Sequence, residues 1–107
     1  MNTEFMTADT NLPPCLPLPG AMLGLPVSST AKVMYARLLG EIYTAGTEDI
    51  NGILFVQFPI AELAAALGRS AQTCKRTLRE LEDAGLLLRV RREIGAPNRI
   101  YVLIPRS

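Results

Sequence analysis

The sequence predicts an α+β domain, mainly α, with the winged helix-turn-helix fold: three helices and a small antiparallel β-sheet with a wing. Three segments, residues 30–44, 59–67 and 71–84, carry apolar residues at helical spacing. Only three residues separate the second segment from the third, which is the spacing of a helix-turn-helix. Segments rich in β-formers lie before and after this pair, as a winged domain requires.

The length and composition allow one domain with one core. The chain has 107 residues, of which 49% are hydrophobic and 20% are charged, as in soluble globular proteins. No apolar run reaches the 18 residues of a membrane span, and the acidic start of the chain does not resemble a secretory signal. We therefore expect a cytoplasmic protein without membrane contact, in which Cys15 and Cys74 are thiols.

Residues 1–27 are predicted to form an amino-terminal arm without a regular element, followed by the winged domain at residues 28–107. Five of the eight prolines lie in this arm, and each removes a backbone donor and fixes φ. Between residues 12 and 27 the arm also carries five leucines and one methionine: Leu12, Leu16, Leu18, Met22, Leu23 and Leu25. Since exposed leucines gain nothing in water, we expect residues 12–27 to lie against their own domain or a partner subunit.

The first helix is expected at residues 30–44, capped by Ser28 or Ser29. Its buried stripe is Ala31, Met34, Tyr35, Leu38, Leu39 and Ile42. A turn at residues 49–52 and a strand at residues 53–58 should follow, and Pro59 suits the first turn of the next helix.

The second helix, residues 59–67, is expected to bury Ile60, Leu63, Ala64 and Leu67. Gly68 can end it with a positive φ, and Ser70 can cap the third helix, residues 71–84. The inner stripe of that helix is Cys74, Thr77, Leu78 and Leu81. This places Cys74 in the core rather than at a reactive site.

A hairpin with strands at residues 86–93 and 100–104 should complete the fold. In the first strand we expect Leu86, Leu88 and Val90 on an apolar face. Leu87, Arg89 and Arg91 would then form the other face. The turn between the strands is Gly95-Ala96-Pro97-Asn98.

Charge is distributed unevenly along the chain. Residues 1–68 hold two basic and six acidic side chains, whereas residues 69–107 hold nine basic and four acidic ones. Such asymmetry indicates either a solvated basic surface or a face that binds a polyanion. Because the third helix and the hairpin of the winged fold lie in the basic part, double-stranded DNA is the expected partner.

The third helix should enter the major groove of the DNA, where base edges are distinguishable. Gln72 can contact adenine, Arg76 guanine, and Thr73 a phosphate or a thymine methyl group. Basic residues of the wing can contact the backbone or the minor groove. The candidate DNA-binding residues are Arg69, Ser70, Gln72, Thr73, Lys75, Arg76, Arg79, Arg91, Arg92, Asn98 and Arg99.

Other interpretations stay open. Arg79 can pair with Asp83 on the same helix face instead of binding DNA. The domain can also be a transcriptional regulator, or a protein-interaction module, which Glu80, Glu82 and Asp83 on the third helix would favour. An enzyme is not expected, because the chain has no histidine and no cysteines at metal-ligand spacing. We expect no cofactor, no metal and no small-molecule substrate.

Several segments resemble the amino-terminal domain of the plasmid replication-initiator A (RepA) family. They include residues 29–35 and 51–56, the run Leu67-Gly68-Arg69-Ser70, residues 78–86 and, most specifically, the hairpin Gly95-Ala96-Pro97-Asn98-Arg99-Ile100-Tyr101. The resemblance covers about residues 16–103. Ala96 departs from the lysine frequent in the family, and Pro59 from its usual Thr cap.

The resemblance implies a homodimeric winged-helix domain that binds repeated sites at a plasmid or mobile-element replication origin. It also implies that the arm helps to form the dimer. The recognition helix from Ser70 and the wing at residues 95–99 would be the DNA contacts. Family initiators carry a further domain, so this chain would be either a fragment or a standalone relative.

Overall fold

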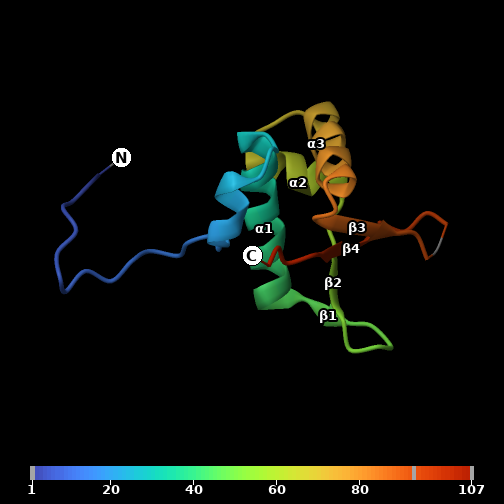
Figure 1. Cartoon of the computed structure of the whole chain (residues 1–107), viewed down its shortest axis with the longest axis horizontal. Helices are drawn as coiled ribbons and strands as arrows, with labels where there is room; N and C mark the ends of the chain where they lie inside the picture. The colour runs from blue at the N-terminus through green and yellow to red at the C-terminus, as the bar shows by residue number, and fades with distance from the viewer. Residues whose placement is uncertain (1, 93, 107) are drawn as a thin grey trace.

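The computed structural model describes residues 2–92 and 94–106. In this part of the chain, helices and strands follow one another as a short helix, a long helix, two strands, the helix pair and a hairpin (Figure 1). Their bounds are η1 (Gly20–Gly24), α1 (Ser29–Ala45), β1 (Thr47–Glu48), β2 (Leu54–Gln57), α2 (Ile60–Leu67), α3 (Ala71–Asp83), β3 (Leu87–Val90) and β4 (Arg99–Val102). This confirms the predicted winged helix-turn-helix. None of the helices among these residues is long and apolar enough to span a membrane.

The four strands form one antiparallel sheet in the order β1-β2-β4-β3. Val56 of β2 pairs with Ile100 of β4, and Arg89 of β3 pairs with the same residue from the other side. β3 therefore lies at an edge, and the β3–β4 hairpin projects from the body as the wing, opposite the amino-terminal arm (Figure 1).

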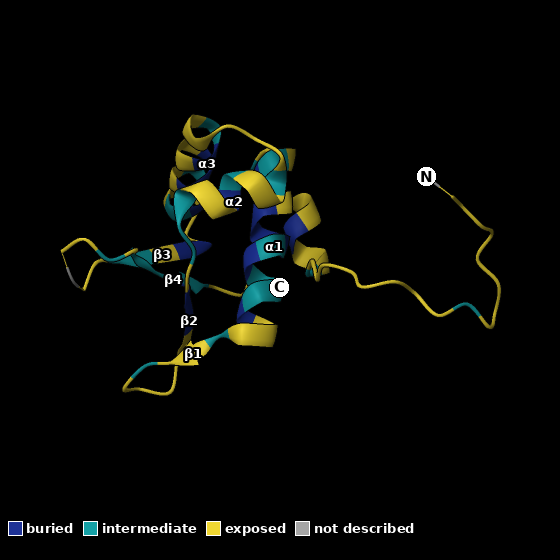
Figure 2. Cartoon of the chain, turned by 180° about the vertical axis from the view of Figure 1, so that it is seen from behind, coloured by how far each residue is buried: buried dark blue, intermediate teal, exposed yellow. Residues whose placement is uncertain are grey.

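The core lies between α1, α3 and the sheet, where the buried residues of Figure 2 converge. Tyr35 of α1 is fully buried, and its hydroxyl donates to the carbonyl of Leu103 at 2.9 Å. That bond satisfies the one polar group that the ring brings into the core. Burial raises the pKa of this phenol. The predicted inner stripes of α1 and α3 are buried, except that Leu39 is half-buried.

The turn of the helix-turn-helix is built as the sequence predicts. Gly68 ends α2 with a φ of 63°, the left-handed region in which glycine has no steric penalty. Ser70 then caps α3, because its Oγ accepts from the N–H of Thr73 at 3.1 Å. Of the predicted apolar face of α2, Leu63 is buried, whereas Ile60, Ala64 and Leu67 are half-buried.

The arm differs from the expectation of a segment without regular structure. Residues 20–24 form the 3-10 helix η1, and Met22 within it is fully buried in the core. Ahead of it, Pro17 lies against Gly40 of α1, where an added Cβ would be only 3.2 Å from the proline ring. The earlier residues of the arm extend away from the body (Figures 1 and 2).

The prediction for the faces of β3 was wrong by one residue. Leu87 is buried at 3% exposure and Leu88 is exposed at 51%. The cause is the end of α3, where Gly85 has a φ of 74° and the N–H of Leu86 donates back to the carbonyl of Leu81. Leu86 thus belongs to the helix cap, and the alternation of the strand begins only at Leu87.

Candidate nucleic-acid interface

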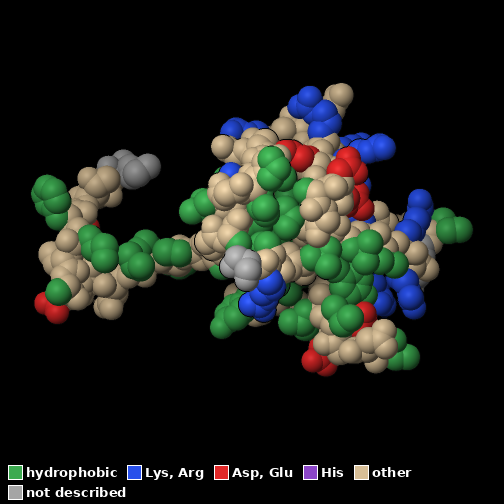
Figure 3. Space-filling model, viewed as in Figure 1, with side chains coloured by type: hydrophobic (Ala, Val, Ile, Leu, Met, Phe, Trp, Pro, Cys, Tyr) green, Lys and Arg blue, Asp and Glu red, His purple; other side chains and the backbone are tan. Residues whose placement is uncertain are grey.

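The outward face of α3 carries four long polar side chains. Gln72, Arg76 and Arg79 follow one another at spacings of four and three residues, which places them on one side of a helix. Lys75 lies beside them, and all four are exposed. The opposite side of α3 holds the buried Cys74, Leu78 and Leu81. Figure 3 shows the basic side chains gathered over α3 and around the wing.

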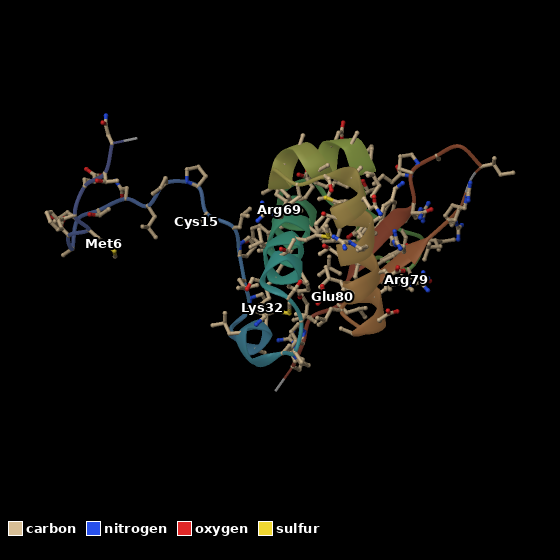
Figure 4. The ribbon with its side chains drawn as sticks, turned by 90° about the horizontal axis from the view of Figure 1, so that it is seen from above. Met6, Cys15, Lys32, Arg69, Arg79 and Glu80 are labelled. Atoms are coloured by element: carbon tan, nitrogen blue, oxygen red, sulfur yellow. The ribbon has the colours of Figure 1, made fainter. Side chains whose placement is uncertain are left out.

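Two of the three acidic residues of α3, Glu80 and Glu82, lie on its flanks and not on this face. Glu80 accepts from the backbone N–H and the hydroxyl of Ser28, each at 2.7 Å. In Figure 4 Glu80 lies toward the start of α1, whereas Arg79 lies on the side of the wing. Glu82 accepts from Arg89 of β3. Because both carboxylates bind partners within the domain, they give little support to an interaction module.

The alternative pairing of Arg79 with Asp83 is not formed. Within residues 2–92 and 94–106, the ion pairs are Arg37–Glu41 and Glu82–Arg89. The guanidinium of Arg79 therefore remains available to a phosphate, as does the ammonium of Lys75. Asp83 lies exposed at the last residue of α3, at the far end of the helix from Gln72.

Ser70 and Thr73 are engaged in the cap of α3. Their hydroxyls lie 3.0 Å apart, and the guanidinium of Arg76 donates to Thr73 Oγ1 at 3.4 Å. Thr73 is half-buried, whereas Arg76 is exposed. This bond holds Nη2 of the Arg76 guanidinium beside the start of α3, while the side chain as a whole stays exposed.

Arg69 lies apart from the outward face of α3. In Figure 4 it lies beside α1, on the opposite side of the domain from Arg79. There it lines a small hollow of about 120 Å³ together with Ser29 and Thr30 at the start of α1. The structure thus brings Gln72, Arg76 and Arg79 together but does not bring Arg69 to them.

The basic residues of the wing are divided between two faces of the sheet. Arg89 faces α3, so its neighbour Val90 and the paired Arg99 face the other way. There the guanidinium of Arg99 stacks on the ring of Phe55 at 4.3 Å. Arg92 lines a hollow of about 280 Å³ on this side with Arg99 and Gln57. Arg99 therefore packs against the sheet and is not grouped with α3.

The remaining two wing candidates differ in exposure. Arg91 is exposed just beyond the end of β3. Asn98 is half-buried and lines a narrow hollow with Phe58 and Leu78, between the wing and the helix pair. Arg91 is therefore the freer of the two.

The carboxylate of Asp49 links the β1–β2 turn to β4 at the base of the wing, and we call this group of hydrogen bonds the Asp49 clasp. Its Oδ1 accepts from the N–H groups of Asn51 and Ile53 at 2.8 and 3.0 Å, and its Oδ2 accepts from the hydroxyl of Tyr101 at 2.8 Å. The N–H of Ile53 above all, then the hydroxyl of Tyr101, hold the pKa of Asp49 below its usual value, with a smaller contribution from Arg99. The clasp ties the β1–β2 turn to β4.

Sequence reasoning missed the supporting roles of Glu80, Glu82 and Asp49. A signal existed for two of them. Glu80 and Glu82 lie one residue to either side of the buried Leu81, so a helical wheel places them on the flanks. Nothing in the sequence identifies their partners, since Ser28 is 52 residues away from Glu80.

A family model described as replication initiator protein A (RepA) N-terminus matches residues 25–104. The chain belongs to this family. It is an amino-terminal domain of the replication-initiator class, and the family resemblance of its hairpin and helix pair is confirmed. The matched range contains α1, the helix pair and the wing, but begins after η1.

Solved structures support the same fold. One described as "Structure of MDR initiator" has a TM-score of 0.72 at 23% identity, covering 97% of this chain and 88% of that chain. One described as "Structure of Rep-DNA complex" has a TM-score of 0.71 at 20% identity, covering 97% and 86%. A third, "N-Terminal domain of DNA binding protein", has a TM-score of 0.67 at 18% identity, covering 99% and 87%. A search of curated proteins found no match.

Proposed function

We propose that this domain binds repeated double-stranded DNA sites at the replication origin of a plasmid or mobile element, with α3 in the major groove. The observation that carries the proposal is the outward face of α3. It presents Gln72, Lys75, Arg76 and Arg79, all exposed, on a helix whose other side is buried. A helix of 13 residues fixed in this way can enter the groove without rearrangement.

The side chains of α3 suggest separate roles. Arg76 suits a bidentate contact with guanine, and Gln72 suits adenine, because their donors and acceptors match those base edges. Lys75 and Arg79 suit phosphates on either side of the groove. Ser70 and Thr73 hold the start of the helix, and Thr73 can add a contact to a phosphate or a thymine methyl group.

In the wing, Arg91 and Arg92 are the proposed backbone or minor-groove contacts. Asn98 and Arg99 are proposed to contribute less to DNA binding, since Asn98 is half-buried and Arg99 stacks on Phe55. Arg69, beside α1, would reach only a phosphate that flanks the site. If about five phosphates are neutralised in total, log K should fall against log salt with a slope of roughly −4 to −5.

Selection of bound sequences from random duplex DNA tests this function. We expect one short motif, and direct repeats of it near the gene of this chain would indicate an origin. An operator-like palindrome would instead indicate a transcriptional regulator. Enrichment of no motif, with binding that does not depend on sequence, would contradict specific recognition by α3.

We further propose that two copies associate through the arm. Leu12, Leu16 and Leu18 are 66%, 51% and 38% exposed, which supports a partner surface for them. The test is sedimentation of the protein without residues 2–15, a deletion that spares Pro17 and the buried Met22. A sedimentation profile that does not change would exclude residues 2–15, and Leu12 with them, from the interface.

The domain is also proposed to act in the cytoplasm and by binding alone. The second statement rests on the sequence, in which histidine is absent and Ser, Asp and Glu lack a recognisable catalytic arrangement. Incubation of supercoiled plasmid with the protein and Mg²⁺ tests it. Nicking or relaxation of the DNA would contradict it.

A further inference from the structure

The recognition helix and the wing are joined directly by one ion pair. The Nε and Nη2 atoms of Arg89 on β3 both donate to Oε1 of Glu82 on α3, at 2.9 and 2.5 Å. The two side chains are 26% and 28% exposed, so water screens the pair only in part. Both elements of the proposed DNA contact are thus linked through two side chains that are not themselves on the outward face of α3.

We propose that Glu82 and Arg89 are positioning residues that fix the wing relative to α3 and thereby determine sequence specificity. This inference rests on the proposed function. Specific binding requires α3 and the wing to reach adjacent grooves at a set separation, and small shifts of a supporting group displace the base contacts.

The position of β3 makes such a link necessary. Among the strands that the structure describes, β3 lies at the edge of the sheet and pairs with β4 alone, and the hairpin projects from the body (Figure 1). Leu87 and Ile100 anchor its base on the side of α3, where they are 3% and 2% exposed. Arg89 is the next residue outward from Leu87 on that side, so its bond to Glu82 sets the angle at which the hairpin leaves the body.

Charge provides a second argument. A carboxylate close to the phosphates of DNA repels them, so Glu82 weakens electrostatic binding to any sequence. Pairing also occupies the guanidinium of Arg89, which could otherwise contact a phosphate. The pair therefore acts against non-specific affinity, and its loss should affect specific and non-specific binding in opposite directions.

The test compares Glu82→Ala with the matched control Asp83→Ala. Each variant removes one carboxylate from neighbouring positions of α3, but Asp83 is exposed and lies outside the pair. Affinities are measured by anisotropy, in the same salt, for the selected site and for a scrambled duplex. In the control we expect both affinities to rise by a similar factor, so that their ratio is unchanged.

For Glu82→Ala we expect non-specific binding to tighten as in the control, while the ratio of specific to non-specific affinity falls by about tenfold, the effect of losing one good base contact. The charge-exchanged protein, Glu82→Arg with Arg89→Glu, should recover most of the ratio. An unchanged ratio in Glu82→Ala overturns the proposal.

Thermal unfolding decides how each result is interpreted. If Glu82→Ala is unfolded at the assay temperature, the folded charge-exchanged protein decides: a ratio near that of the original protein supports the proposal, and a ratio tenfold lower overturns it. Should the unaltered protein show no preference for any site, the proposed function fails first, independently of Glu82.

Discussion

The recognition helix and the wing are both basic, but their charges are used differently. On α3 the cations of Lys75, Arg76 and Arg79 are exposed, and Glu80 and Glu82 are turned to the flanks of the helix. In the wing, Arg89 is bound to Glu82 and Arg99 stacks on Phe55. Although α3 and the wing are similar in composition, the cations of α3 are free to bind a ligand, whereas Arg89 and Arg99 of the wing hold the domain together.

The difference shows that the number of basic residues overestimates how many of them are available to bind DNA. A guanidinium that already has a carboxylate or an aromatic ring as partner loses that contact when it moves to a phosphate. The residues to substitute first are therefore those without such a partner. Four predictions test this comparison, from the largest expected effect to the smallest.

The wing depends on Leu87 for its attachment, so Leu87→Ala should have the largest effect. Because this side chain is 3% exposed, we expect the free energy of unfolding to fall by roughly 2–5 kcal/mol. Urea unfolding measures it. Leu88→Ala is the control, with an expected change of at most about 0.5 kcal/mol at 51% exposure. Equal losses in the two variants would mean that the strand faces are assigned incorrectly.

Arg76→Ala tests the free surface of α3. We expect a loss of about 1–3 kcal/mol in affinity for the selected site and relaxed preference at one base pair, since a bidentate base contact is removed. Stability should change little because the side chain is exposed. Anisotropy titration against the site and its single-base variants gives both quantities. Undiminished affinity would show that the helix is oriented differently on DNA.

Arg99→Ala tests the structural role of the arginines in the wing. Removal of the guanidinium from the Phe55 ring should lower stability by about 0.5–1 kcal/mol. DNA affinity should fall by less than in Arg76→Ala, and nearly equally for all sequences. The comparison of α3 with the wing is wrong if Arg99→Ala loses specific affinity as strongly as Arg76→Ala while its unfolding curve stays unchanged.

The clasp at Asp49 predicts a small effect of acid. Its pKa is lowered in the folded protein, so the stabilisation is fully present above the unfolded pKa of about 3.9 and is lost as the pH falls through the lower folded value. Asp49→Asn lacks this titration. The difference in melting temperature between the two proteins should therefore be largest near neutral pH and shrink on acidification to about pH 3. A constant difference would exclude Asp49 as the titrating group.

The sequence predicted the helices and their buried sides well, because each has a clear apolar stripe and a polar cap. The stripe of Cys74, Thr77, Leu78 and Leu81 is buried as expected. Ser28 and Ser70 both cap, and Gly68 has the positive φ that a short turn needs. These features depend on neighbours within one or two helical turns.

Features that depend on distant partners were not predictable. The faces of β3 were predicted incorrectly because Leu86, Leu87 and Leu88 are chemically alike. Only the cap at Gly85 decides which residue of the strand faces inward. The strand β1 has two residues and no pattern of its own. The partners of Glu80, Glu82 and Asp49 lie far along the chain or on another element.

The burial of Met22 has a consequence for how the domain boundary is drawn. A side chain from outside the helix-turn-helix fills a space under α1, so the folding unit begins at η1 rather than at the first helix. Progressive amino-terminal shortening should therefore leave the melting temperature nearly constant until Met22 is removed, and then lower it abruptly. A fusion partner or label attached ahead of residue 16 should be tolerated, whereas one inserted at residue 25 should not.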